Sequence, residues 1–169
     1  MLVVVADTHG RDGPRLDGRT REAVREAELV CHCGDFMTES VLDAFQDAAG
    51  EFVGVYGNND PPAVRERLSD TAVVDHEGVR LALAHGHDHT ETALSMFGRQ
   101  SNADLVCVGH SHDPGFRMAG VVPVLNPGSH ADPRWYRPAH AELEVDSDVV
   151  AGRLVDPDGT VFDRFEVER

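Results

Sequence analysis

The first ten residues, Met1-Leu-Val-Val-Val-Ala-Asp-Thr-His-Gly10, decide the class of fold. Residues 1–6 are continuously apolar, which is typical of a strand that is buried on both faces of a sheet. Polar residues, Asp7 and His9 among them, follow where this strand ends. In open parallel sheets, ligand sites collect at the carboxyl ends of the strands. The segment therefore predicts a buried parallel strand with a site at its end.

The same order of strand, polar loop and helix recurs in the first half of the chain. Apolar strands are predicted over residues 29–33 and 52–56, and helices over residues 20–28 and 40–49. A short third helix is predicted over residues 61–68, because proline is tolerated in the first turn of a helix. The alternation of strands and helices predicts parallel βαβ units.

The second half of the chain is richer in strands. One helix is predicted over residues 90–100, and a turn over residues 156–159, Asp-Pro-Asp-Gly. The predicted strands cover residues 71–75, 79–84, 105–108, 121–125, 139–145, 149–155 and 161–167. A chain of 169 residues is long enough for one buried core and short for two. We therefore expect one α/β domain over residues 1–169.

Several side chains that can bind a divalent metal follow the predicted strands. They are Asp7, His9, Asp35, Asn58, His85, His110 and His112. Each of them alone is more typical of a turn, a helix cap or a hydrogen-bonded core histidine. Together they exceed the four ligands of one tetrahedral ion, which indicates two ions that share a carboxylate. Residues two apart in an extended segment point the same way, so each Asp-x-His or His-x-His pair is expected to converge. Gly34, Gly57 and Gly109 precede three of the motifs and allow a sharp exit of the backbone.

These residues, in this order, resemble the signature of a known family, the calcineurin-like metallophosphoesterases. The matching motifs are Asp7-x-His9, Gly34-Asp35, Gly57-Asn58, His85, Gly109-His110-x-His112 and Asn126-Pro127-Gly128-Ser129. Within the family the chain looks most like the small single-domain phosphodiesterases of archaea and bacteria, the YfcE type. The resemblance implies two mixed β-sheets packed as a sandwich and flanked by helices, a four-layer αββα fold.

The resemblance also divides the ligands between two divalent ions. One ion would be held by Asp7, His9, Asp35 and His112, and the other by Asp35, Asn58, His85 and His110. Imidazole and oxygen ligands suit manganese, iron, zinc, nickel or cobalt, and we expect manganese first. The implied activity is that of a phosphodiesterase, in which a hydroxide that bridges the ions attacks the phosphorus in line with the leaving group. The alternatives are a phosphomonoesterase or protein phosphatase, and a non-catalytic scaffold such as a eukaryotic retromer subunit of the same branch.

Two further residues are predicted to act on the substrate. Asn59 stands where many family members have a histidine that is a candidate acid for the leaving group. An amide has no proton to give at a useful pH, so Asn59 can hydrogen-bond the phosphate but not protonate the leaving group. His87 is the first candidate for another acid, followed by His89.

Other polar residues have more than one interpretation. His32 lies between Cys31 and Cys33 and is interpreted as structural, with support of the site as the alternative. Arg11 and Arg134 follow motifs and could steer a substrate phosphate. Among fifteen arginines, however, a solvated surface position is the first interpretation for both. An odd number of cysteines, three, argues against a disulfide framework.

The chain is strongly acidic. Thirty Asp and Glu residues face fifteen Arg and no Lys, which gives a net charge of −15. Repulsion between its own charges should destabilise such a chain in dilute buffer. At about 1 M salt the Debye length falls to roughly 3 Å, and most of this repulsion is screened. We therefore expect a halophilic, cytoplasmic protein.

The charge disfavours a large nucleic-acid surface, and no apolar run is long enough for a membrane span or resembles a signal peptide. The expected partner is a small phosphate-ester substrate, and a homo-oligomer stays open.

Overall fold

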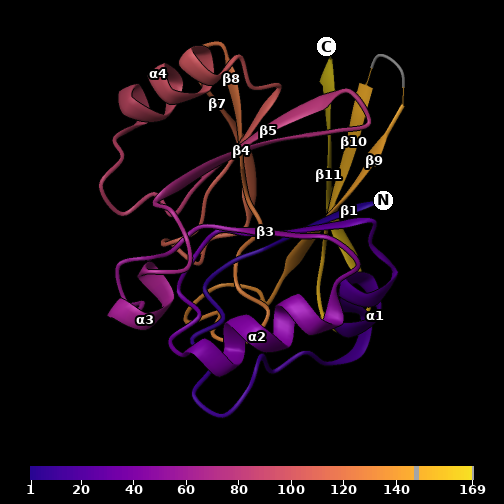
Figure 1. Ribbon diagram of the computed structural model, residues 1–169. Coiled ribbons are helices and arrows are strands. Elements are labelled where there is room, and N and C mark those ends of the chain that lie inside the picture. The colour runs from indigo at the N-terminus through magenta and orange to yellow at the C-terminus, as the bar shows by residue number, and fades with distance from the viewer. Residues whose placement is uncertain (147–148, 169) are drawn as a thin grey trace.

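The computed structural model describes residues 1–146 and 149–168 and contains two β-sheets (Figure 1). The six-stranded sheet has the order β11 (Val161–Glu168), β10 (Val149–Val155), β9 (His140–Val145), β1 (Leu2–Val5), β2 (Leu29–His32) and β3 (Phe52–Gly54). The five-stranded sheet has the order β4 (Thr71–His76), β5 (Val79–Ala84), β6 (Leu105–Cys107), β8 (Val122–Asn126) and β7 (Gly115–Ala119). The helices are α1 (Gly18–Glu26), α2 (Glu39–Ala48), α3 (Pro62–Arg65) and α4 (Glu91–Ser101). The predicted domain also includes residues 147–148 and 169, which lie outside the described residues.

Both sheets mix parallel and antiparallel pairs. In the six-stranded sheet β1 pairs in parallel with β2, and β2 with β3, whereas β9, β10 and β11 pair antiparallel. In the five-stranded sheet β5, β6 and β8 are parallel, and β4 and β7 are antiparallel strands at the two edges. The parallel strands align their carboxyl ends, which is where the predicted ligands lie.

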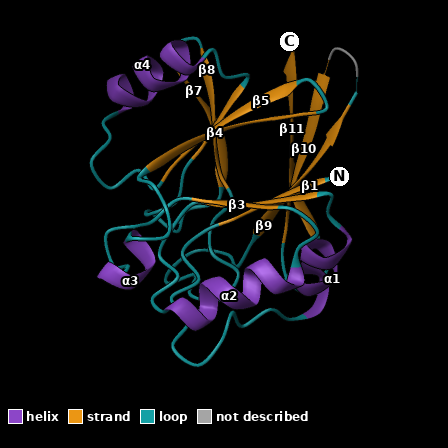
Figure 2. Cartoon of the chain, viewed as in Figure 1, coloured by secondary structure: helices purple, strands orange, loops and turns teal. Residues whose placement is uncertain are grey.

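Apolar side chains pack in three layers around the two sheets. Leu2 and Val4 of β1 point into the layer between the sheets, together with residues such as Leu81 of β5. Val3 and Val5 point to the opposite face of the six-stranded sheet. Helices α1 and α2 cover that face, and α4 covers the outer face of the five-stranded sheet (Figure 2). The predicted four-layer αββα sandwich is therefore confirmed.

Two of the helices begin at threonine caps. The Thr38 hydroxyl accepts a hydrogen bond from the Val41 amide at 3.3 Å, at the start of α2. The Thr90 hydroxyl accepts one from the Ala93 amide at 3.2 Å, at the start of α4. A side chain of this kind satisfies a free amide of the first turn and stabilises the helix by about 1 kcal/mol.

The structure differs from the sequence prediction in two elements. Strand β7, Gly115–Ala119, was not predicted. It lies at a sheet edge with Arg117 and Met118 exposed, so it lacks the apolar pattern on which the prediction depended. The helix predicted over residues 61–68 is one turn, Pro62–Arg65, followed by turns. Within the described ranges, no helix has the length and apolar character needed to cross a membrane.

Candidate metal centre

Every predicted metal ligand lies in a loop at the carboxyl end of a strand. Asp7 and His9 follow β1, Asp35 follows β2, Asn58 follows β3, His85 follows β5, and His110 and His112 follow β6. Main-chain hydrogen bonds of 3.0 Å join the loops in pairs, from the amide of Asp7 to the Gly34 carbonyl and from the amide of Gly109 to the His85 carbonyl. Both sheets therefore supply residues to one site.

The backbone at these ligands is not extended. Asp7, His9 and Asp35 have φ values of 52°, 46° and 64°, and His110 and His112 have values of 68° and 60°. The expectation that Asp-x-His and His-x-His converge as extended pairs is therefore wrong. Left-handed φ values are uncommon and unfavourable for residues with a side chain. A cluster of them indicates that the surrounding fold holds the ligand loops in place.

One group of candidate ligands consists of Asp7, His9 and His112, whose ligand atoms lie within 4.8 Å of one another. His112 Nε2 lies 3.7 Å from Asp7 Oδ1. The other ring nitrogen of His112, Nδ1, donates a hydrogen bond to the main-chain carbonyl of Asp132. Because a carbonyl can only accept, this bond fixes the tautomer and leaves Nε2 free to act as a ligand.

A second group consists of Asp7, Asp35 and His85, again with ligand atoms within 4.8 Å. His85 Nδ1 donates to the Cys33 carbonyl at 2.7 Å, so that Nε2 faces Asp35 Oδ2 at 3.3 Å. The residue before Asn58 must be glycine, because the backbone of Gly57 lies very close to the Asp35 side chain. A Cβ atom at Gly57 would lie 2.1 Å from Asp35 Oδ1, so any other residue would displace the carboxylate.

Asn58 and His110 complete this side of the site and are exposed. The Asn58 side-chain oxygen lies 3.0 Å from His85 Nε2 and 3.1 Å from His110 Nδ1. The rings of His85 and His110 are 5.3 Å apart. The structure thus brings all the predicted ligands together, in a cluster with a buried side and an exposed side.

Which carboxylate lies between the two groups is a separate question. The resemblance predicts that Asp35 is shared, whereas Asp7 is the residue common to the two compact groups. Asp35 Oδ2 is nevertheless 3.2 Å from His9 Nε2 and 3.3 Å from His85 Nε2. Asp35 therefore also contacts one residue of each predicted set, and the two carboxylates lie side by side at the centre of the cluster.

Buried polar atoms without partners test whether the site suits a metal. Both carboxylate oxygens of Asp7, His9 Nε2 and His112 Nε2 are buried and have no hydrogen-bond partner among the described residues. Buried polar groups in native proteins are almost always hydrogen-bonded, and an unpaired buried charge is strongly destabilising. Divalent cations bind oxygen and imidazole ligands of this kind, so these residues fit a metal centre.

The two central carboxylates differ in proton affinity. Burial raises the pKa of Asp7 to about 7, although nearby His85 opposes the shift. Burial acts on Asp35 as well, but its contacts with His85 and His9 hold the pKa of Asp35 below its usual range. In the absence of a cation, Asp7 is therefore the carboxylate that takes up a proton, and a cation would displace that proton on binding.

His32 connects two of the ligand loops. Its Nδ1 accepts a hydrogen bond from the Gly34 amide at 3.1 Å, so the proton is on Nε2, which donates to the Thr8 hydroxyl at 2.9 Å. Burial lowers the pKa of His32 well below its usual value, which keeps the ring neutral for both bonds. Thr8 lies between Asp7 and His9, and the structure thus favours the supporting position that the sequence left as the alternative.

Asp60 is a supporting residue that the sequence analysis missed. Its Oδ2 accepts hydrogen bonds from the amides of Asp35 at 2.9 Å and Gly57 at 2.8 Å. Its Oδ1 accepts one from the amide of Met37 at 2.9 Å. Its position directly after Asn58 and Asn59 could have indicated this role, because a carboxylate in such a loop can accept hydrogen bonds from the free main-chain amides.

Asn59 and His87, the predicted substrate-facing residues, lie at the edge of the cluster. The Asn59 amide group donates to Asp35 Oδ2 at 2.7 Å, and its main-chain amide donates to Asp35 Oδ1 at 2.9 Å. The ring of His87 is 5.4 Å from that of His85, and its Nε2 lies 3.0 Å from Asp88 Oδ2. Their roles toward a substrate stay predictions.

Comparison with known families tests the resemblance directly. The sequence model of the calcineurin-like phosphoesterase superfamily domain matches residues 1–148. The chain belongs to this superfamily. Membership places it among the metallophosphoesterases, hydrolases that use divalent metals, and the Asp and His groups described above are consistent with that chemistry.

Individual relatives agree with this assignment. The probable metallophosphoesterase YsnB of Bacillus subtilis is 28% identical over 170 residues, covering 98% of this chain and 96% of the relative. Phosphodiesterase MJ0936 of Methanocaldococcus jannaschii is 29% identical over 112 residues, 60% of this chain and 66% of the relative. The crystal structure of Vps29 from Entamoeba histolytica in complex with Zn²⁺ has a TM-score of 0.75 at 22% identity, covering 99% of this chain and 98% of the other. The predicted branch of small metallophosphoesterases and its fold are confirmed.

Proposed function

We propose that the chain is a phosphodiesterase that depends on two divalent ions, with manganese as the first candidate. One observation carries the proposal. The predicted ligands converge, and four of their buried ligand atoms have no hydrogen-bond partner within the described part of the chain. The ions would be held by the two predicted sets, Asp7, His9, Asp35 and His112, and Asp35, Asn58, His85 and His110.

The chain's own residues prepare the site for this chemistry. Two divalent ions at such a site lower the pKa of water and neutralise the charge of phosphoryl oxygens. The carbonyls of Cys33 and Asp132 orient His85 and His112, and the Asn59 amide holds Asp35 in place. Such outer contacts raise metal affinity by about 10–100-fold in known sites.

The preference for diesters comes from the family resemblance and from a relative that matches part of the chain and is named a phosphodiesterase. Asn59 bears on the leaving group instead, because it offers no proton to the strongly basic leaving groups of alkyl phosphates. The exposure of Asn58 and His110 gives a small phosphate ester access to the metal ligands from solvent.

The test is reconstitution of the activity. Protein stripped with EDTA is loaded with Mn²⁺, Zn²⁺, Ni²⁺ or Co²⁺, its metal content is measured, and it is assayed with bis(p-nitrophenyl) phosphate and p-nitrophenyl phosphate. We expect two ions per chain and a higher kcat/KM for the diester. Faster hydrolysis of the monoester would favour a phosphomonoesterase. Two bound ions without hydrolysis of either ester would favour the scaffold.

A further inference from the structure

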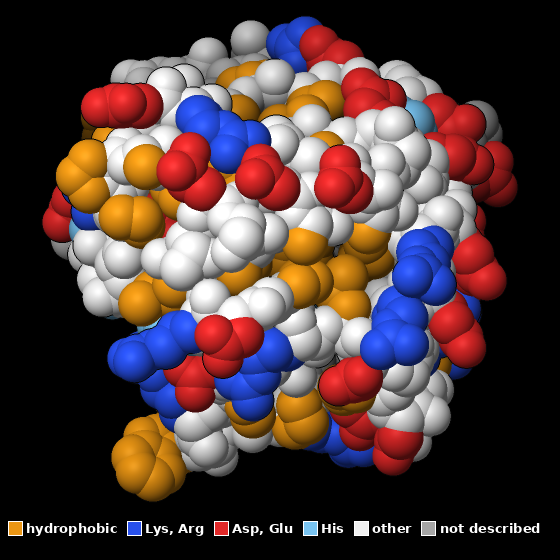
Figure 3. All heavy atoms as spheres, turned by 60° about the horizontal axis from the view of Figure 1, so that its bottom comes forward, with side chains coloured by type: hydrophobic (Ala, Val, Ile, Leu, Met, Phe, Trp, Pro, Cys, Tyr) orange, Lys and Arg blue, Asp and Glu red, His pale blue; other side chains and the backbone are white. Residues whose placement is uncertain are grey.

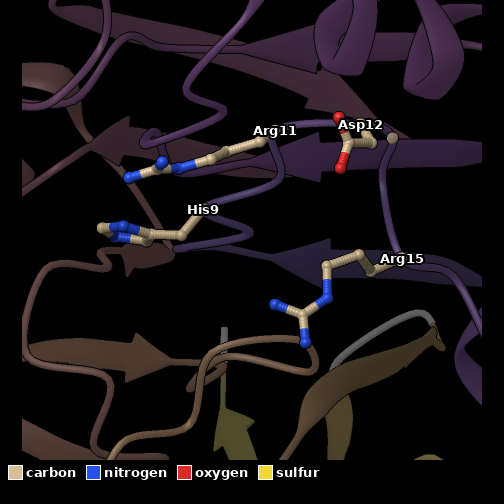
Figure 4. A pocket seen from close by; sticks show the side chains of 5 residues that line it. His9, Arg11, Asp12 and Arg15 are labelled. Carbon is tan, nitrogen blue, oxygen red and sulfur yellow. The ribbon is translucent and has the colours of Figure 1, made fainter.

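A cavity of about 590 Å³ opens directly beside the candidate metal centre (Figure 4). Its lining includes His9 together with Arg11, Asp12, Gly13 and Arg15 from the loop that follows β1. Figure 4 shows the Arg11 side chain extending in the same direction as the His9 ring. One predicted metal ligand and two guanidinium groups therefore border the same space.

The two arginines lack the carboxylate partners that several other arginines of this chain have. Arg19, Arg67 and Arg80 each pair with a carboxylate at 2.7 Å. Arg11 and Arg15 are exposed, and neither has an ion pair or hydrogen bond to any residue in the ranges that the structure describes. In a chain with twice as many acidic as basic residues, two cations left unpaired next to one cavity attract an anion from outside.

The loop presents these arginines in a constrained shape. A Cβ atom at Gly10 would lie 2.1 Å from the Gly13 carbonyl oxygen, so this close approach requires glycine. Arg15 has a φ value of 51°, a conformation that is unfavourable by about 1–2 kcal/mol for a residue with a side chain. The ring of His130 donates through Nε2 to the Pro14 carbonyl at 3.0 Å and anchors the loop next to Arg15. Strain of this kind is typical of functional sites.

We infer that the cavity is a subsite for a second anionic group of the substrate, bound by Arg11 and Arg15. The inference deepens the proposed function and rests on it, because the first phosphate would lie at the metal ligands. A phosphate or a carboxylate fits the planar, charged donors of arginine, and both allow bidentate bonds. The preferred substrate is then a phosphate ester that carries a further anionic group beyond the scissile phosphate.

Calorimetric titration of the manganese-loaded protein tests the subsite without requiring turnover. The probes are thymidine 5′-monophosphate and thymidine 3′,5′-bisphosphate. The bisphosphate should bind about 10-fold more tightly. In the double variant Arg11→Gln/Arg15→Gln that advantage should fall below about 2-fold, since the second phosphate loses its charge-assisted bonds.

The matched control removes the same charge elsewhere. Arg25 and Arg164 are exposed arginines that do not line the cavity, and Arg25→Gln/Arg164→Gln should keep the advantage. Equal affinities for the two probes in the unaltered protein, or equal loss in both double variants, would overturn the subsite. Hydrolysis of bis(p-nitrophenyl) phosphate is measured in parallel. Its absence alongside a retained bisphosphate preference would overturn the diesterase and leave the subsite standing.

Discussion

Two buried polar clusters in this molecule contain similar residues and are built in opposite ways. At the candidate metal centre, both oxygens of Asp7 are buried without a hydrogen-bond partner in the described structure. In the second cluster, Glu142 of β9 is equally buried and accepts hydrogen bonds from Arg19 at 2.7 Å, Arg153 at 2.9 Å and His140 at 3.1 Å. His140 in turn contacts the Thr20 hydroxyl at 3.0 Å.

The difference separates structural from functional burial. A buried carboxylate whose oxygens are all bonded by the protein has no capacity left for a ligand, and removing it disrupts the fold. A buried carboxylate without hydrogen-bond partners keeps its oxygens free to take up a proton or to bind a ligand. Charge and burial alone would not distinguish Asp7 from Glu142, whereas their hydrogen-bond partners do.

The largest expected effect is the loss of Asp35, the carboxylate that we propose the two ions share. Asp35→Asn should lower kcat/KM by about 10³-fold, since it weakens the binding of both ions. Metal analysis of the variant should find less than one ion per chain. Glu142→Gln is the control and should bind the full complement of metal.

Asp7→Asn distinguishes the two carboxylates that lie between the ligand groups. If Asp35 is shared, this variant keeps the ion held by Asn58, His85 and His110. An Asp7 variant that binds no metal, alongside an Asp35 variant that retains one ion, would show that the two ions share Asp7, the residue common to the two compact groups. The prediction of Asp35 as the bridge would then be wrong.

A second effect at the metal centre concerns the proton of the leaving group. Asn59 donates to Asp35 and has no proton to transfer. We therefore expect the rate to depend steeply on leaving-group pKa across a series of aryl and alkyl diesters. Asn59→His should raise the rate for alkyl esters by up to about 10²-fold and for aryl esters much less. Asn59→Gln, which adds no acid, should not. A shallow dependence in the unaltered protein would point to another acid, with His87 first.

Local signals in the sequence were sufficient for most strands and for the polar residues that the structure brings together, whereas the two-sheet sandwich was expected from the family resemblance. Apolar runs that end in Asp or His marked the strands and the ligands. The sequence could not give the left-handed backbone at Asp7 and His9, which the packing of neighbouring loops imposes. It also could not identify Asp60 as the acceptor for three loop amides, since those contacts join residues up to 25 positions apart.

Replacing Glu142 should lower the stability of the fold, whereas replacing Asp35 should mainly lower the activity. Glu142→Gln removes a buried charge that two arginines and His140 share, and breaking such groups costs about 3–5 kcal/mol when all partners are buried. Arg19 and Arg153 are 23% and 35% exposed and remain hydrated, so we expect a loss of about 2–3 kcal/mol. Urea unfolding of the metal-free protein measures it. A loss below about 0.5 kcal/mol would contradict a structural role for this cluster.

His130 combines features of the Asp7 and Glu142 sites. One of its ring nitrogens donates a hydrogen bond to the Pro14 carbonyl, and the other has no hydrogen-bond partner in the described structure. Burial lowers the pKa of His130 to about 4, and nearby His140 and Arg15 add to the shift. Because the unfolded chain binds this proton near pH 6.5, stability should be complete above that pH and fall as pH decreases toward 4. We expect a loss of about 2 kcal/mol between pH 7.5 and pH 5. His130→Gln should remove that part of the slope in urea melts across this range. An unchanged slope would contradict the prediction.

The smallest effect expected concerns the exposed charges rather than the buried ones. Acidic side chains are scattered over the face in Figure 3, beside fewer basic ones. Salt screens the interactions between exposed charges that lie farther apart than the Debye length, which is roughly 3 Å at 1 M, but it acts little on buried pairs. The melting temperature should therefore rise by about 2–4 °C between 0.1 M and 2 M KCl, as expected for a gain of about 1 kcal/mol. The destabilisation caused by Glu142→Gln should change little across the same series, because the Glu142 carboxylate itself is buried. A melting temperature that stays flat or falls with salt would remove the argument for salt adaptation, and a Glu142→Gln effect that fades with salt would place that cluster among the surface charges.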